Sequence, residues 1–195
     1  MVDEKKWGIL YCPKGGFLTS SNKRWKRAER CLKAHNIDFD MVKSESSASV
    51  YHLVKMMIGN GYKTIIIFGG DSALNDAVNC VMQEDSELRN SIVFGIIPNG
   101  VMNDFAHFWG FQEDNIEETI SWLHKRRVRK IDLGCIRYEN RRGERCHRYF
   151  HNCINIGLIA AIMNLRRRMR NLFGSRTLSF LFSFALLAFQ RMDYK

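Results

Sequence analysis

Apolar runs and amphipathic stretches alternate along the first two thirds of this chain. The runs Trp7–Cys12, Lys63–Phe68 and Ser91–Ile97 are rich in aliphatic residues, which is typical of strands buried in a parallel sheet. The longer segments between the runs have the spacing of helices. The predicted strands are residues 7–12, 38–42, 63–68 and 91–97, and the predicted helices are residues 20–34, 46–58, 71–83, 103–109 and 113–125.

The order of these elements predicts the fold class. Strands and helices that alternate in this way form an α/β domain with a doubly wound, mostly parallel sheet, whose ligands lie beyond the carboxyl ends of the strands. Two predicted helices also have residues typical of helix ends. Ser20 or Ser21 is expected to cap the first helix, and Gly59-Asn60-Gly61 is expected to end the second.

The pattern changes near residue 127. Two strand-like segments flank a polar turn and predict an antiparallel hairpin, and two helices are expected after it. The last apolar helix is too short to span a bilayer, which needs about 20 residues. We therefore expect a nucleotide-binding domain over residues 1–127, and the start of a β-rich second domain over 128–195, with strands at 128–138 and 145–155 and helices at 158–172 and 175–190.

Two glycine-containing loops follow the third and fourth predicted strands. The first is Gly69-Gly70-Asp71-Ser72-Ala73-Leu74-Asn75, and the second is Pro98-Asn99-Gly100-Val101-Met102-Asn103-Asp104-Phe105-Ala106. Each loop leads into a predicted helix. A strand, a glycine turn and a helix N-terminus make a phosphate site, because free backbone N–H groups and the helix dipole point at the anion.

The two loops resemble those of the diacylglycerol kinase catalytic domain, in the bacterial lipid kinase group that includes sphingosine-kinase-like enzymes. That family has a Gly-Gly-Asp-Gly-Thr-Leu-Asn loop and a later Pro-Leu-Gly-Thr-Gly-Asn-Asp-Phe-Ala loop, where this chain has residues 69–75 and 98–106. Residues 9–16, 130–134 and 149–157 resemble further family segments. The similarity therefore extends over nearly the whole chain, in the same order.

The resemblance implies an ATP- and Mg²⁺-dependent lipid kinase that phosphorylates the hydroxyl of diacylglycerol or a related lipid. It makes Asp71 and Asp104 the catalytic candidates, with Asp71 also the metal ligand. The alternative for either aspartate is a helix cap, and for Lys14 an exposed loop position. The residues expected to contact nucleotide are Lys14, Ser44, Gly69, Gly70, Asp71, Ser72, Ala73, Leu74, Asn75, Gly100, Val101 and Asn103.

Several positions depart from the family pattern. Ser72 stands where the family has glycine, Ala73 lacks the family's hydroxyl, and Val101-Met102 replace Thr-Gly. Each lost hydroxyl removes a hydrogen bond of about 0.5–1.5 kcal/mol. The family also has a complete second domain with a late acidic catalytic residue, so we expect this chain to be truncated at its C-terminal end.

The excess positive charge lies in the last third of the chain. The net charge is +10, and residues 121–195 carry 17 Lys and Arg against 4 Asp and Glu. Such a region suits an anionic membrane surface, and a solvated face is the alternative. Nucleic-acid binding lacks a motif and is not expected. The six cysteines form no CxxC pair and no apolar leader precedes them, which favours a cytoplasmic protein. With the basic last third, the expectation is peripheral contact with the membrane.

Two other functions stay open. The departures in the loops and the short second domain favour a non-catalytic nucleotide- or lipid-binding remnant. A small-molecule kinase of the NAD kinase type shares the first glycine loop but not the Asn103–Ala106 segment. His107, His124, His147 and His151 are expected on the surface or satisfied in the core rather than as metal ligands. The sequence leaves the lipid acceptor and the oligomeric state open.

Overall fold

The computed structural model describes residues 5–13, 18–46, 48–100, 103–154, 160–161 and 185, with side chains from residue 21 onward in the first helix. The chain divides into two compact units, residues 1–152 and 153–195, and every element named below belongs to the first. Lys14 and Val101 lie outside the described residues, as do nearly all residues of the two helices expected beyond residue 157. The expected domain boundary near residue 127 stays a prediction.

A four-stranded parallel sheet forms the centre of the first unit, as the alternating pattern predicted. The register pairs Tyr11 with both Lys43 and Phe68, and it pairs Gly69 with Pro98, so the carboxyl ends of all four strands meet at one edge. The strand order is β2 (Phe39–Lys43), β1 (Trp7–Tyr11), β3 (Thr64–Gly69) and β4 (Val93–Pro98).

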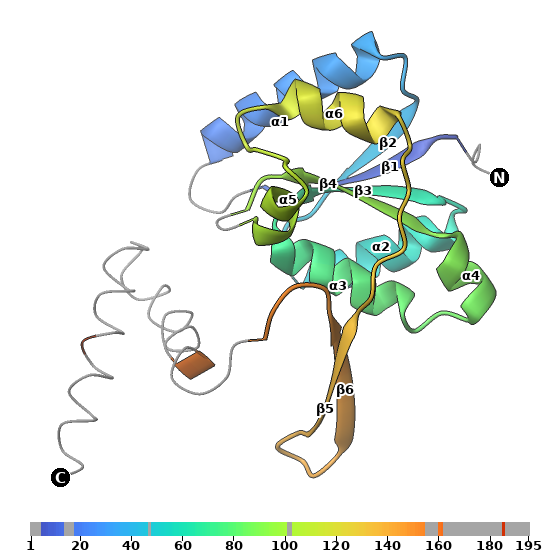
Figure 1. Ribbon diagram of the computed structural model, residues 1–195, viewed down its shortest axis with the longest axis vertical. Coiled ribbons are helices and arrows are strands. Elements are labelled where there is room, and N and C mark those ends of the chain that lie inside the picture. The colour runs from blue at the N-terminus through green and yellow to red at the C-terminus, as the bar shows by residue number, and fades with distance from the viewer. Residues whose placement is uncertain are drawn as a thin grey trace. The chain divides into compact units, whose positions relative to one another are not determined.

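Helices cover both faces of the sheet (Figure 1). Ile9 and Ile66 pack under one pair of helices, whereas Leu10 and Ile65 pack under the other, because side chains alternate between the faces of a strand. Burial on both faces explains why β1 and β3 are apolar at nearly every position. The first pair is α1 (Leu18–Ala34) with α6 (Ile116–His124), and the second is α2 (Ser49–Gly59) with α3 (Asp71–Val81).

The helix ends correct part of the sequence analysis. The first helix begins at Leu18, so neither Ser20 nor Ser21 is its N-cap. The stop at Gly59-Asn60-Gly61 is confirmed, since Gly61 has φ +93° and its N–H bonds the carbonyl of Ile58. The short helix α4 (Ser86–Ser91) was not predicted. Its start is fixed by Asp85, whose carboxylate accepts the Leu88 N–H at 2.9 Å.

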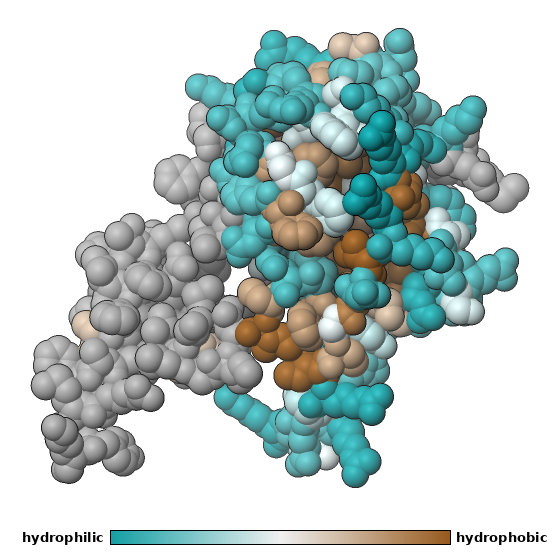
Figure 2. Space-filling model, in the orientation of Figure 1, coloured by the Kyte–Doolittle hydropathy of each residue, from teal (hydrophilic) through white to brown (hydrophobic). Residues whose placement is uncertain are grey.

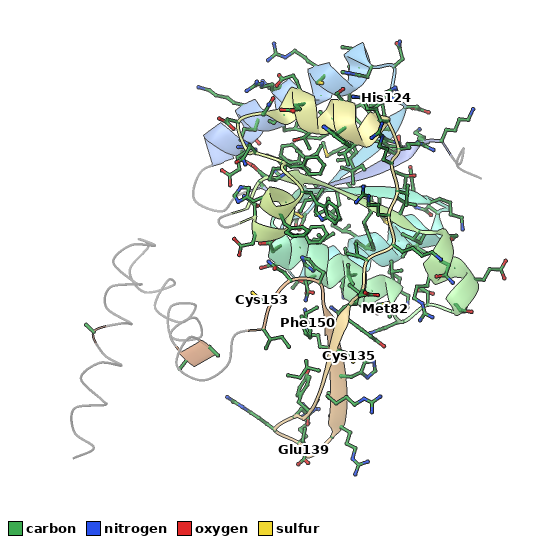
Figure 3. The ribbon with its side chains drawn as sticks, in the orientation of Figure 1. Met82, His124, Cys135, Glu139, Phe150 and Cys153 are labelled. Atoms are coloured by element: carbon green, nitrogen blue, oxygen red, sulfur yellow. The ribbon has the colours of Figure 1, made fainter. Side chains whose placement is uncertain are left out.

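The predicted hairpin is present but shorter than expected. It consists of β5 (Gly134–Glu139) and β6 (Arg145–Phe150), so the strand expected from residue 128 was wrong over 128–133. Figure 3 shows Phe150 and Cys135 at the base of the hairpin and Glu139 at its tip. The Phe150 ring lies over Gly134, where a Cβ would come within 2.0 Å of the ring. A side chain at residue 134 would therefore displace this ring.

The hairpin docks on α3 through polar groups. The Asn79 side chain pairs with the backbone of Tyr149, donating to its carbonyl at 2.8 Å and accepting its N–H at 2.9 Å. An amide used in this way substitutes for a neighbouring strand. Arg148 forms an ion pair with Asp76, which lies about one helical turn before Asn79 in α3. The end of the hairpin is thereby held beside the helix that follows the first glycine loop.

Candidate functional site

The two glycine loops contact each other directly at the carboxyl edge of the sheet. The Asn99 N–H donates to the Gly69 carbonyl at 2.7 Å, which continues the pairing of β3 and β4 by one residue. A Cβ on Gly70 would lie 2.7 Å from the Gly100 Cα, and a Cβ on Gly100 would lie 2.5 Å from the Gly70 Cα. Backbone therefore packs on backbone, and both positions require glycine whether or not a phosphate binds there.

Asp71 links the first loop to the helix of the second loop. Its carboxylate accepts the Asp104 N–H at 2.8 Å and the Phe105 N–H at 3.1 Å, the first amides of α5 (Asp104–Phe108). The sequence analysis left open whether Asp71 is functional or caps the helix that it begins. The structure shows a third arrangement, because Asp71 caps α5 rather than its own helix α3. The N-terminus of α5 is thus occupied by a carboxylate.

The N-terminus of α3 is arranged differently. The Gly70 carbonyl accepts the N–H groups of Ala73 and Leu74. Within the described part of the chain, the N–H groups of Asp71 and Ser72 have no hydrogen-bond partner. These two donors and the positive end of the helix dipole favour an anion. The Ala73 and Leu74 side chains are buried in the core, so any contact that they make with a ligand would come from the backbone.

Asn103 holds the second loop from inside. It adopts the left-handed conformation with φ +54°, and its side chain is fully buried. Its Oδ1 accepts the Gly100 N–H at 2.7 Å, and its Nδ2 donates to the Glu113 carboxylate. A side chain buried in this way braces the loop. Direct contact between Asn103 and a nucleotide stays a prediction, and it would require the loop to open.

Sequence reasoning missed two residues that support these loops. Asn99 is buried, and its Nδ2 donates to the Cys12 carbonyl at 3.1 Å and to the Ser21 hydroxyl at 3.0 Å, which joins the loops after β1 and β4. The position of Asn99 in the second loop could have indicated this supporting role. Arg24 of α1 donates to the Pro98 carbonyl at 2.5 Å. Burial lowers the pKa of Arg24, and nothing in its local sequence indicated this role.

Ser44 lies at the expected edge but bonds within its own turn. Its hydroxyl donates to the Ser46 carbonyl at 2.6 Å and lies 2.9 Å from the Ser49 hydroxyl, which positions the start of α2. The neighbouring Cys12 thiol has its pKa raised to about 12 by burial, so it is neutral at pH 7. All six cysteines are unpaired. A nucleotide contact from Ser44 stays a prediction.

His151 joins the end of the hairpin to the first loop. Its Nδ1 lies 3.3 Å from the Asn75 Oδ1, and its ring packs edge-on against Phe105 at 4.8 Å between centroids. Burial lowers the pKa of His151, opposed by the charge of Asp71. Its Nε2 is buried without a hydrogen-bond partner among the described residues. The expectation of a surface or satisfied histidine was therefore wrong at this position.

The carboxylates fit a magnesium ion held largely by phosphate and water. Asp71 is fixed between the loops, and Asp104 beside it is exposed, with no side-chain partner among the described residues. No group of three or more His, Cys, Asp or Glu residues in the described part of the chain could hold a metal alone. Mg²⁺ commonly uses one or two carboxylates together with substrate phosphates. These two residues would supply them.

A separate pocket of about 260 Å³ lies between the hairpin and helices α2 and α3. None of the predicted site residues lines it. The pocket is lined by Ala48, Tyr51, Asp76, Asn79, Gln83, Tyr138, His147 and Arg148.

In the described part of the chain no helix is both long and apolar enough to cross a membrane.

A parallel α/β sheet with an open helix N-terminus and two packed glycine loops at its carboxyl edge is an arrangement typical of phosphate-binding domains. The model of the diacylglycerol kinase catalytic domain matches residues 6–136 of this chain. The chain therefore belongs to that family, as the resemblance of the two loops indicated. The family places the chain among the lipid kinases and their relatives.

Individual relatives agree with the family. The chain is 32% identical over 74 residues to a protein of Shewanella frigidimarina (strain NCIMB 400) named "Probable lipid kinase YegS-like", a match that covers 38% of this chain and 23% of that protein. A crystal structure of a diacylglycerol kinase from Bacillus anthracis strain Sterne has a TM-score of 0.55 at 22% identity, covering 69% of this chain and 47% of that one. Another structure from that organism has the same TM-score at 23% identity. The chain thus spans less than half the length of these structures.

Proposed function

We propose that this chain is the nucleotide-binding part of an ATP- and Mg²⁺-dependent lipid kinase that phosphorylates the hydroxyl of diacylglycerol or a related lipid. One observation carries the proposal: the open N-terminus of α3 and the Asp71 carboxylate lie together where the two glycine loops meet. Family membership supports a kinase. The finer assignment of nucleotide, metal and acceptor is our inference from the chemistry of these groups.

The transfer forms a bond between the lipid hydroxyl oxygen and the γ-phosphorus of ATP and breaks the bond from that phosphorus to the β–γ bridging oxygen. The Asp71 and Ser72 N–H groups would bind phosphate oxygens at the positive end of α3. A bound Mg²⁺ would neutralise the charge on the phosphates, held by Asp71 and Asp104. The exposed Asp104 carboxylate is also our candidate to accept the hydroxyl proton. Lys14, Ser44 and Asn75 remain proposed nucleotide contacts.

The first test measures nucleotide binding by the chain itself. Titration calorimetry with ATP and Mg²⁺ should detect binding to the wild type, and Asp71→Asn should weaken it at least tenfold by removing one carboxylate charge from the site. Asp38→Asn is the matched control, because Asp38 is exposed just before β2, at the opposite edge of the sheet. Equal affinity in both variants would contradict the role given to Asp71.

The second test measures transfer. The chain is mixed with ATP, Mg²⁺ and diacylglycerol in detergent micelles, and phosphatidic acid is quantified. Formation of lipid phosphate that Asp104→Asn abolishes supports the kinase and the role of Asp104. Nucleotide binding without turnover favours the non-catalytic binding remnant, which is the alternative suggested by the departures from the family pattern in the two glycine loops. Phosphorylation of NAD in preference to lipid would replace the lipid kinase by the NAD kinase type.

The membrane and localisation inferences belong to the same proposal. A kinase with a lipid acceptor must reach the membrane surface, and the basic last third of the chain is suited to anionic head groups. We therefore propose a cytoplasmic protein that contacts the membrane peripherally. The basic segment Arg166–Arg170 lies outside the described residues.

A further inference from the structure

The segment between α6 and β5 is extended, exposed and strongly basic. We call residues 125–133 the strap, which contains no helix or strand. Figure 3 shows it running from His124 at the end of α6 toward Cys135 at the base of the hairpin. Five of the six residues from 125 to 130 are Lys or Arg, and all six are exposed. Asp132 is the single acidic residue of the strap.

Cations of the strap lie over tryptophan rings on two neighbouring helix ends. Lys125 and Arg127 lie 5.7 and 5.6 Å from the Trp122 ring centroid, and Arg129 lies 5.9 Å from that of Trp109. These contacts join the end of α6, the strap and the end of α5 into one surface. We call it the aromatic–basic surface, made up of Phe108, Trp109, Trp122 and residues 125–131.

This surface leaves large apolar side chains open to solvent. Phe108 is 79% exposed, Val128 61%, Trp122 44%, Ile131 42% and Trp109 37%. A single exposed apolar residue is ordinary, whereas five of them around five cations require an explanation. In Figure 2, which shows the orientation of Figure 1, brown atoms lie among teal ones along the path of the strap.

We propose that the aromatic–basic surface docks on an anionic lipid bilayer, with its cations at the head groups and its apolar side chains at the acyl boundary. Trp, Phe and aliphatic residues beside Lys and Arg are the composition that partitions to this interface. A nucleic acid would need free ring faces for stacking. Here cations lie over the rings of Trp109 and Trp122, and Val128 and Ile131 would have no partner on a nucleic acid.

The position of the surface also relates it to the catalytic candidates. Phe105 donates its N–H to Asp71, and its ring contacts the Trp109 ring at 6.3 Å between centroids. A bilayer bound at Trp109 would therefore lie one short helix away from the glycine loops. The inference deepens the proposed function and rests on it only for the choice of a lipid surface as partner.

The test is sedimentation of the full chain with vesicles of phosphatidylcholine and phosphatidylserine. A triple variant, Arg127→Gln with Arg129→Gln and Lys130→Gln, should bind about ten- to a hundredfold more weakly, because each cation near an anionic surface contributes about fivefold. The matched control removes three exposed hairpin cations by Arg137→Gln, Arg141→Gln and Arg142→Gln. Its affinity for the vesicles should fall much less.

Tryptophan fluorescence gives a second readout. The chain has four tryptophans, and Trp7 and Trp25 are buried at 2% and 9% exposure, so a blue shift on adding vesicles reports Trp109 and Trp122. The variant Phe108→Ser with Val128→Ser keeps every charge. It should bind several-fold more weakly even at high salt, where the contribution of the cations is screened.

Three results would overturn the inference. They are no binding of the wild type to anionic vesicles at low salt, equal losses in the strap and hairpin variants, or tighter strap-dependent binding to duplex DNA than to vesicles. Calorimetry with ATP separates this inference from the proposed function. The strap variant should keep its nucleotide affinity, whereas Asp71→Asn should keep its vesicle binding.

Discussion

The N-termini of α3 and α5 look alike in sequence but are used in opposite ways. Each follows a buried strand and a glycine, and each begins with an aspartate, Asp71 or Asp104. At α3 the first two N–H groups are without partners in the described part of the chain, whereas at α5 they are bonded by the Asp71 carboxylate. Of the two similar loops, one therefore leads into a helix N-terminus that is open and the other into one that is capped.

This difference indicates how the second glycine loop is stabilised. An anion at a helix N-terminus contributes about 0.3–1 kcal/mol, and up to about 2 kcal/mol when partly buried. At α5 a side chain of the protein supplies that anion, so the second loop is held in place without a ligand. At α3 the same favourable position is open, and we propose that a phosphate occupies it.

The largest effect is expected where the loops touch. In Gly100→Ala the new Cβ would lie 2.5 Å from the Gly70 Cα and 2.6 Å from the Asn103 Oδ1, so the loops must separate. We expect a loss of about 3 kcal/mol in the free energy of unfolding, measured by urea denaturation. Gly59→Ala is the control, since a Cβ there meets nothing within 4 Å, and it should be neutral or slightly stabilising.

A smaller effect is expected from removing the cap of α5. Asp71→Ala leaves the Asp104 and Phe105 N–H groups without their acceptor and should cost about 2 kcal/mol of unfolding free energy. Asp104→Ala removes an exposed carboxylate and should cost less than about 0.5 kcal/mol. Thermal and urea unfolding of the two variants compare them directly. Equal losses would mean that the two aspartates are not used differently.

The smallest effect concerns pH. Because burial lowers the pKa of His151, the fold favours its neutral form. Its contribution to stability is complete above the ordinary histidine pKa of about 6.5 and is lost as pH falls below that value. His151→Gln should therefore show a smaller fall in melting temperature between pH 7 and pH 5 than the wild type. The exposed His107→Gln should behave as the wild type does, and a similar change in both would contradict the role of burial.

Local patterns predicted the strands and most helices because burial leaves a periodic mark on the sequence. The run Ile65–Phe68 is apolar throughout, since both faces of β3 are covered. The prediction of a strand at residues 128–133 was wrong because apolar residues in this segment are not buried. Val128 and Ile131 resemble strand residues, yet they are exposed on the strap. Period alone does not say whether an apolar residue finds a partner.

The sequence by itself determined the parallel α/β class, the family and the two loops at the carboxyl edge, because these depend on local hydrophobicity and on short motifs. Only the tertiary structure decided that Asp71 caps α5, that Gly70 packs on Gly100 and that His151 reaches Asn75. Each of these contacts joins residues about thirty or more positions apart. Contacts of this kind are set by the sheet register and by helix packing, which no local pattern encodes.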